Sequence, residues 1–172
     1  MTWTEYFIKM AELTASKSKD PSTKVGVVVV GRDNQVLSTG FNGFPRGVRE
    51  NEIVDWQGAD GIMVTGDQVD AERWARPAKY MFVEHAERNA VYNAARTGVS
   101  LKGATMYFNF EPCPCNECAK AVIQAGIAKL VGYNRPFPGK GAQWEESLRV
   151  SKIMLKEAAV QIIELPEGGG ND

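Results

Sequence analysis

The sequence is poor in the residues that bind metals and form disulfides. Its 172 residues include one histidine, His85, and three cysteines, all of which lie in the short segment 113–118. Cysteines confined to one segment do not form the disulfide framework of a small secreted domain. We therefore expect a reducing, cytoplasmic compartment.

Long apolar runs and a strong net charge are also missing. The longest purely aliphatic run, residues 27–30, is far too short to cross a membrane. The first ten residues carry Glu5 and Lys9 and lack the apolar region of a signal peptide. The formal net charge is −1, so bulk electrostatics favours neither nucleic acid nor an anionic membrane as a partner.

Alternating helices and strands fill most of the chain, which is 44% hydrophobic. The predicted elements are a helix at 2–18, strands at 24–31 and 35–41, a helix at 84–97, a strand at 104–110, a helix at 116–126, a strand at 128–133, a helix at 144–159 and a strand at 160–165. One face of the first helix should carry Trp3, Phe7, Met10 and Thr14. This order predicts an α/β domain over 1–165, with a mostly parallel sheet covered by helices, and a disordered tail at 166–172.

The segment 48–78 does not fit this alternation. It is too long for an ordinary connection and has only short periodic pieces. It is either a surface excursion or an insertion that forms a flap or subunit contact beside the functional site. The second interpretation rests on its position, because it directly precedes the helix that begins near His85.

The cysteines and the histidine together indicate a metal site. Cys115 and Cys118 have the C-x-x-C spacing at the start of a predicted helix, where the helix N-terminus favours thiolates. With His85 they make three ligands, which is typical of a catalytic zinc site with an open position. A closed site that also uses Cys113 is conceivable. We favour the open site with Cys113 as a small, partly buried apolar residue, and we expect Asn116 to cap the helix.

Glu87 follows His85 by two residues. Residues at that spacing do not face each other within a helix, so both serve one site only if they lie in the first helical turn and the metal lies off its end. Glu87 would then be a proton carrier and not a ligand. The combination H-x-E with P-C-x-x-C is typical of zinc deaminases.

Several longer motifs make the chain similar to the deoxycytidylate (dCMP) deaminase family. They are "EYF", "SKSKDPSTKVG", "GFNGFPRG", "HAERNA" and "PCNECAKAVIQAGI", which occur in this order and cover most of the chain. The resemblance implies a three-layer α-β-α fold with a mixed five-stranded sheet, and zinc-dependent hydrolysis of dCMP to dUMP. It also implies a homo-oligomer, often a hexamer, that dCTP activates and dTTP inhibits together with Mg²⁺.

The resemblance also implies roles for individual residues. Asn42 should contact the substrate sugar, while Glu87 and the backbone around Ala86 should hold the pyrimidine. Tyr133, at the end of a strand, either stacks on the base or caps the core. The effector nucleotides should contact the residues Asp20, Lys24, Gly43 and Arg96, the last of which matches a position near subunit contacts.

Simpler interpretations exist for several of these residues. Lys24 can be a solvated lysine at a strand end, Asp20 can belong to a turn with Pro21, and Asn42 and Gly43 can form a tight turn. The sequence departs from the family in two ways. The segment 48–78 has no histidine or cysteine, so we expect no second zinc there, and the reading "EPCPCNEC" overlays two patterns that relatives use separately.

Other functions remain open at this point. A deaminase of dCTP, of a nucleoside or of a free base would need different pocket residues outside the motifs. A polynucleotide deaminase is disfavoured by the net charge of −1, because such enzymes benefit from a basic surface. A non-enzymatic, zinc-stabilised binding module would leave the placement of Glu87 unexplained.

Overall fold

A mixed five-stranded sheet forms the centre of the computed structural model, which describes residues 1–57, 62–69, 71–138 and 140–166. The strands lie in the order β2 (Val36–Phe41), β1 (Gly26–Val30), β5 (Thr105–Phe108), β6 (Lys129–Tyr133) and β7 (Gln161–Leu165). Strand β1 is antiparallel to both β2 and β5, whereas β5, β6 and β7 are mutually parallel. The predicted mixed α/β sheet is confirmed.

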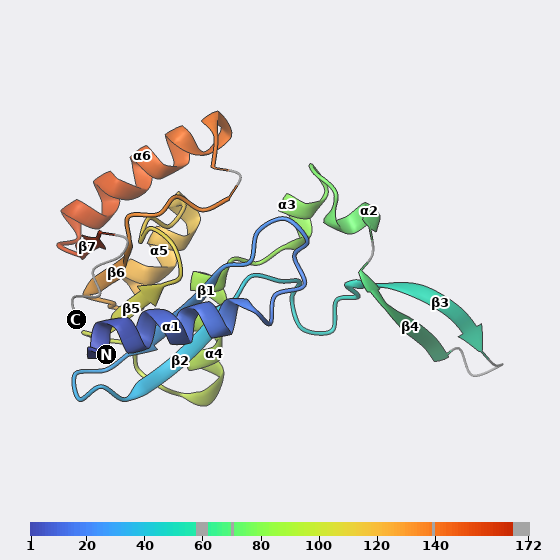
Figure 1. Ribbon diagram of the computed structural model, residues 1–172, viewed down its shortest axis with the longest axis horizontal. Coiled ribbons are helices and arrows are strands. Elements are labelled where there is room, and N and C mark those ends of the chain that lie inside the picture. Colours follow the sequence, from blue (N-terminus) through green and yellow to red (C-terminus); the bar gives the residue numbers. More distant parts are fainter. Residues whose placement is uncertain (58–61, 70, 139, 167–172) are drawn as a thin grey trace.

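Helices cover both faces of this sheet, as expected for a three-layer fold (Figure 1). The helix α1 (Trp3–Ala15) packs on one face, and α4 (Ala86–Thr97), α5 (Asn116–Gln124) and α6 (Ala142–Glu157) pack on the other. All residues of β1 are buried, because its valines alternate between the α1 face and the α4 face.

Two glycines allow helices to approach the sheet closely. A Cβ atom on Gly26 would lie 2.3 Å from the carbonyl oxygen of Ala11 in α1. A Cβ atom on Gly40 would lie 2.1 Å from the carbonyl oxygen of Ala86 and 2.5 Å from the amide nitrogen of Ala90, both in α4. These contacts involve backbone, which cannot rotate away as a side chain can. Gly40 therefore fixes the distance between β2 and the first turn of α4.

We expect Gly40→Ala to destabilise the protein by about 1–3 kcal/mol, since the added methyl group overpacks a rigid contact. Activity should also fall, because α4 must shift at the end that carries Glu87. Chemical denaturation measures the stability change. Gly43→Ala is the matched control, because its Cβ would meet only the ring of Phe41 at 3.8 Å. Equal stability of the two variants would contradict this explanation.

The face of α1 agrees with the prediction in part. Phe7 is fully buried as expected, together with Ile8, Ala11 and Ala15, but Trp3 is 59% exposed. Trp3 stacks on the ring of Phe7, with centroids 5.6 Å apart and an interplanar angle of 18°. Phe7 therefore covers the sheet, and Trp3 covers Phe7 from outside.

The segment 48–78 contains more regular structure than its sequence suggests. Strands β3 (Asn51–Gln57) and β4 (Ile62–Val69) form an antiparallel hairpin that projects away from the main sheet (Figure 1). The short helices α2 (Ala71–Trp74) and α3 (Lys79–Phe82) then return the chain to the body. The ring of Phe44 stacks on Trp74 and on Phe82, with centroids 4.6 and 5.3 Å apart, and so holds both short helices.

Two further expectations concern the C-terminal tail and membrane-spanning segments. Apart from Pro166, the tail predicted at 166–172 lies outside the described residues. None of the helices in the described part of the chain has the length and apolar character needed to cross a membrane.

Candidate active site

Three side chains from two helix starts form a potential metal site. The Nδ1 atom of His85 lies 3.4 Å from the sulfur of Cys115 and 3.4 Å from the sulfur of Cys118. All three ligand atoms lie within 4.8 Å of one another. Cys113 is buried and free, and it is not part of this group among the residues that the structure describes.

The positions of His85 and Cys115 explain why these side chains meet. Each is the N-cap residue of its helix, in extended conformation, His85 for α4 and Cys115 for α5. Within the described residues neither side chain caps its own helix, so both point to the shared site. Both helix N-termini contribute positive partial charge there, which favours thiolates and other anions. We predicted Asn116 as the N-cap of this helix, but it is the first helical residue instead. Its side chain accepts a hydrogen bond from the Ser147 hydroxyl of α6.

The electrostatics of the group favour bound metal. A hydrogen bond from the Cys118 thiol, assisted by His85, lowers the pKa of Cys115 to about 4, so this residue is a thiolate at neutral pH. The same hydrogen bond and burial raise the pKa of Cys118. Without metal, the two sulfur atoms of Cys115 and Cys118 therefore share one proton. A divalent cation would displace that proton, because both sulfurs bind it as thiolates.

The distances fit zinc. Zinc–sulfur bonds of about 2.3 Å and zinc–nitrogen bonds of about 2.0–2.1 Å, at tetrahedral angles, separate sulfur and nitrogen by about 3.5 Å. The two observed separations of 3.4 Å agree with that value. Three protein ligands in this arrangement leave one tetrahedral position open for water or substrate.

Glu87 lies beside this group in the first turn of α4, where the H-x-E spacing placed it. Its side chain is only 7% exposed and lines the same cavity as His85 and Cys115. Burial raises the pKa of Glu87 above the usual value for a carboxyl group. A carboxyl group with a raised pKa holds a proton more readily, which suits a proton carrier next to an open metal position.

The cavity extends from this group across one end of the sheet and has mainly apolar walls. His85, Glu87 and Cys115 line one end of it. The other lining residues are Asp20, Thr23, Val25, Asn42, Arg76, Lys79, Tyr80, Val83, Ala86, Phe108, Phe110, Glu111, Cys113, Phe137, Pro138, Trp144 and Leu148. Such a combination of aromatic walls and few polar groups is typical of a site for a planar, partly apolar ligand. Ala86 is fully buried in the wall, next to His85 and Glu87.

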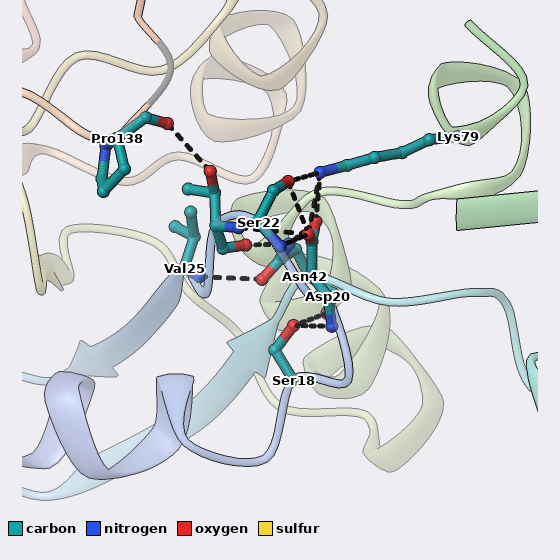
Figure 2. A network of polar contacts seen from close by, with 8 residues as sticks. Ser18, Asp20, Ser22, Val25, Asn42, Lys79 and Pro138 are labelled. Atoms are coloured by element: carbon teal, nitrogen blue, oxygen red, sulfur yellow. Dashed lines mark hydrogen bonds and ion pairs between the residues drawn. The ribbon is translucent and has the colours of Figure 1, made fainter. Parts of the chain in front are cut away.

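Asn42 lines the cavity, but its amide group is committed to the protein. The Oδ1 atom accepts a hydrogen bond from the amide of Val25, while Nδ2 donates to Asp20 and to the carbonyl oxygen of Thr23 (Figure 2). Its backbone carbonyl accepts a hydrogen bond from the Ser18 hydroxyl. Asn42 thus joins the "SKDPSTKVG" and "GFNGFPRG" segments. Neither Asn42 nor Gly43 has positive φ or lies in a turn, and Gly43 forms a β-bridge with Glu84, so the tight-turn interpretation is wrong.

The residues with predicted effector roles are spread over the molecule. Asp20 is 1% exposed and pairs with Lys79, and both backbone groups of Gly43 bond to Glu84. Lys24 is exposed just before β1, and Arg96 is exposed in the last turn of α4. Only Asp20 among these four lines the cavity.

Tyr133 is not brought to the cavity, so the expected stacking on a base has no support among the described residues. Its place in the sheet gives the reason. Side chains alternate along a strand, and Tyr133 shares its face with Val131, which pairs with Tyr107 on the α1 side. The cavity lies on the opposite face, where Phe108 points.

The amino-terminal three quarters of the chain matches a known protein family. Residues 1–134 match the family described as "Cytidine and deoxycytidylate deaminase zinc-binding region". The chain belongs to this family. The deoxycytidylate deaminase of Mus musculus is 37% identical over 160 residues, which cover 93% of this chain and 78% of the mouse protein. An uncharacterised deaminase of Aliivibrio fischeri is 35% identical, with 95% and 94% of the two chains covered.

A solved structure supports the same relationship. The dCMP deaminase of the cyanophage S-TIM5, in complex with dCMP and dUMP, is 25% identical and superposes with a TM-score of 0.60, covering 94% of this chain and 95% of that chain. The protein is therefore a hydrolytic deaminase with the fold of the deoxycytidylate deaminases.

Several residues of this deaminase site were not identified from its sequence. Trp144 at the start of α6 lies against the His85 ring, with centroids 5.9 Å apart, and Tyr80 meets Trp144 edge-on at 5.9 Å. Phe137 completes this aromatic wall at 6.0 Å from Trp144. These residues belong to segments without a recognisable motif. The available signal was that Phe137 and Trp144 lie on either side of the start of α6, where the loop meets the helix.

Proposed function

We propose that this enzyme converts dCMP and water to dUMP and ammonia. The observation that carries the proposal is the cavity that ends at His85, Cys115 and Cys118 with the buried carboxyl group of Glu87 beside them. The relatives named deoxycytidylate deaminases, and the S-TIM5 enzyme with dCMP and dUMP bound, support the choice of substrate.

The side chains divide the chemistry among them. His85, Cys115 and Cys118 would hold zinc, which when bound acts as a Lewis acid and lowers the pKa of water towards neutrality. Glu87 takes a proton from the attacking water and delivers it to the pyrimidine ring nitrogen N3. The oxygen of that water forms a bond to C4. Glu87 then carries the remaining hydroxyl proton to the amine, and the C4–N bond breaks with release of ammonia as the C4 carbonyl forms. The backbone at Ala86 and the apolar walls hold the base flat and exclude bulk water.

A side-by-side assay of ammonia release tests the proposal. The purified enzyme is given dCMP, dCTP, cytidine and a short single-stranded oligonucleotide at equal concentrations. We expect dCMP to have the highest kcat/KM. A higher kcat/KM for dCTP would make the enzyme a triphosphate deaminase, and a preference for the oligonucleotide would place it among polynucleotide deaminases.

We further propose that dCTP activates and dTTP inhibits the enzyme, with Mg²⁺ bound to the triphosphates, and that the enzyme is a homohexamer. The support is the resemblance of "SKDPSTKVG" and "GFNGFPRG" to family segments, and the hydrogen bonds that join these segments here. With dCMP varied, dTTP should raise the half-saturation concentration and dCTP should reverse that change. A coupling free energy of about 1–3 kcal/mol is ordinary for such an effect. Hyperbolic kinetics that neither triphosphate alters would contradict the proposal.

A further inference from the structure

The charged side chains of the cavity carry information about the ligand. Among the described residues, the carboxylates, lysines and arginines that line it are Asp20, Arg76, Lys79, Glu87 and Glu111. Glu87 belongs to the catalytic end, where it serves proton transfer. The other four lie towards the rest of the cavity and determine which charges a ligand meets there.

Three of those four are already neutralised. The Nζ atom of Lys79 lies 2.6 Å from Oδ2 of Asp20 and 2.6 Å from the Ser22 hydroxyl. Both contacts are drawn in Figure 2. Both side chains of this ion pair are almost fully buried, at 9% and 1% exposure. Glu111 is paired with Lys140 at 2.6 Å. Burial would raise the pKa of Asp20, but the hydrogen bonds from Lys79 and from Ser22 and Thr23 outweigh it and lower the pKa, so Asp20 stays a carboxylate.

Arg76 is the remaining cation, and within the described residues it has no carboxylate partner. Its side chain is exposed, and its guanidinium carbon lies 5.9 Å from the centre of the Tyr80 ring. Tyr80 contacts Trp144, and Trp144 contacts His85. A continuous wall of aromatic rings therefore connects Arg76 to the metal ligands, with Arg76 at its outer end.

This arrangement suits a ligand with an apolar, planar part and a distant anion. A guanidinium group offers several N–H donors in a planar fork that matches a phosphate, and it keeps its charge at all physiological pH values. Lys79 cannot take this role without leaving the buried Asp20 carboxylate without its positively charged partner, which is costly. Arg76 has no carboxylate partner within the described residues, so binding a phosphate would break no ion pair there.

We propose that Arg76 binds the 5′-phosphate of the substrate nucleotide and so makes the enzyme select a nucleotide over the corresponding nucleoside. The inference rests on the proposed deamination of dCMP. It assigns a role in specificity to the segment 48–78, because Arg76 lies between α2 and α3 on that segment and not on the sheet or the site helices. The catalytic end would thus be supplied by the α/β core, and the phosphate contact by the inserted segment.

The test compares dCMP with deoxycytidine as substrates of the wild-type enzyme, Arg76→Ala and Arg76→Lys. Loss of a charge-assisted contact to phosphate should lower kcat/KM for dCMP by roughly 10- to 100-fold in Arg76→Ala, mainly through KM. The value for deoxycytidine should stay unchanged, which also shows that the variant is folded. Arg76→Lys should recover part of the loss, since it keeps the charge without the planar fork.

Arg149→Ala is the control for a change of net charge, because Arg149 is exposed on α6 and pairs with Glu146 away from the cavity. It should leave the ratio of the two kcat/KM values unchanged. If the wild-type enzyme itself does not prefer dCMP to deoxycytidine, the proposed function fails and this inference fails with it. If the wild type prefers dCMP and Arg76→Ala keeps the full preference, the proposed function stands and the role of Arg76 is refuted.

Discussion

Replacing Glu87 by alanine is expected to abolish nearly all deamination while the protein keeps its zinc. General acid–base catalysis contributes about 10²- to 10⁴-fold to a rate, and Glu87 has to move every proton in the proposed reaction, so the loss should lie at the upper end of this range or beyond. Metal content should remain at about one zinc per chain, because the ligands would be His85, Cys115 and Cys118. Steady-state kinetics with dCMP and elemental analysis of the same preparation measure both quantities.

The chain offers a matched control for this change. Glu117 is the second residue of α5, as Glu87 is of α4, but it is exposed and forms an ion pair with Lys120 at 2.6 Å. Glu117→Ala removes the same charge from the same helical position and should keep most of the activity. Loss of zinc from Glu87→Ala together with activity would mean that Glu87 is a ligand and that the proton carrier lies elsewhere.

The second large effect concerns the cysteines. Cys115→Ser and Cys118→Ser should each lose both zinc and activity, because a hydroxyl group does not replace a thiolate as a zinc ligand. Cys113→Ser should keep zinc and most of the activity. Cys113 is 7% exposed, burial raises the pKa of its thiol, and it lies outside the group formed with His85 in the described structure.

Zinc content of the three purified serine variants, measured after dialysis without chelator, decides between the ligand pairs. The decisive comparison is between Cys113→Ser and Cys115→Ser, since Cys118 belongs to either pair. A metal-free Cys113→Ser protein beside a zinc-containing Cys115→Ser protein would shift the pair to Cys113 and Cys118.

The sequence predicted those parts of the site that depend on local geometry. The C-x-x-C spacing lies at the start of one helix, and the H-x-E spacing lies at the start of another. Each spacing brings its side chains to a helix end independently of the packing of the rest of the chain. The structure accordingly places His85 and Cys115 at N-caps and Glu87 in the first turn. The fully buried strand β1 also followed from composition, because a run of valines has no polar side to expose.

Features that depend on long-range packing were missed. The sequence left open whether Tyr133 stacks on a base or caps the core, because the face of a strand residue depends on register with its neighbours. It also did not show that Trp3 lies outside Phe7, which already occupies the sheet surface. Asn42 lines the cavity and its predicted contact with the substrate sugar stays a prediction, but the sequence did not show that its amide bonds to residues 20–25. Arg76 could not be recognised, because its approach to the cavity depends on how α2 and α3 return from the hairpin.

The most direct test of the account is X-ray absorption spectroscopy at the zinc edge of the purified enzyme. An open site formed by His85, Cys115 and Cys118 predicts two sulfur neighbours at about 2.3 Å and two lighter neighbours, one nitrogen and one oxygen, at about 2.0–2.1 Å. A fit that requires three sulfur atoms and one nitrogen would mean that Cys113 closes the site. Such a site has no position for water, so this result would contradict the proposed hydrolysis.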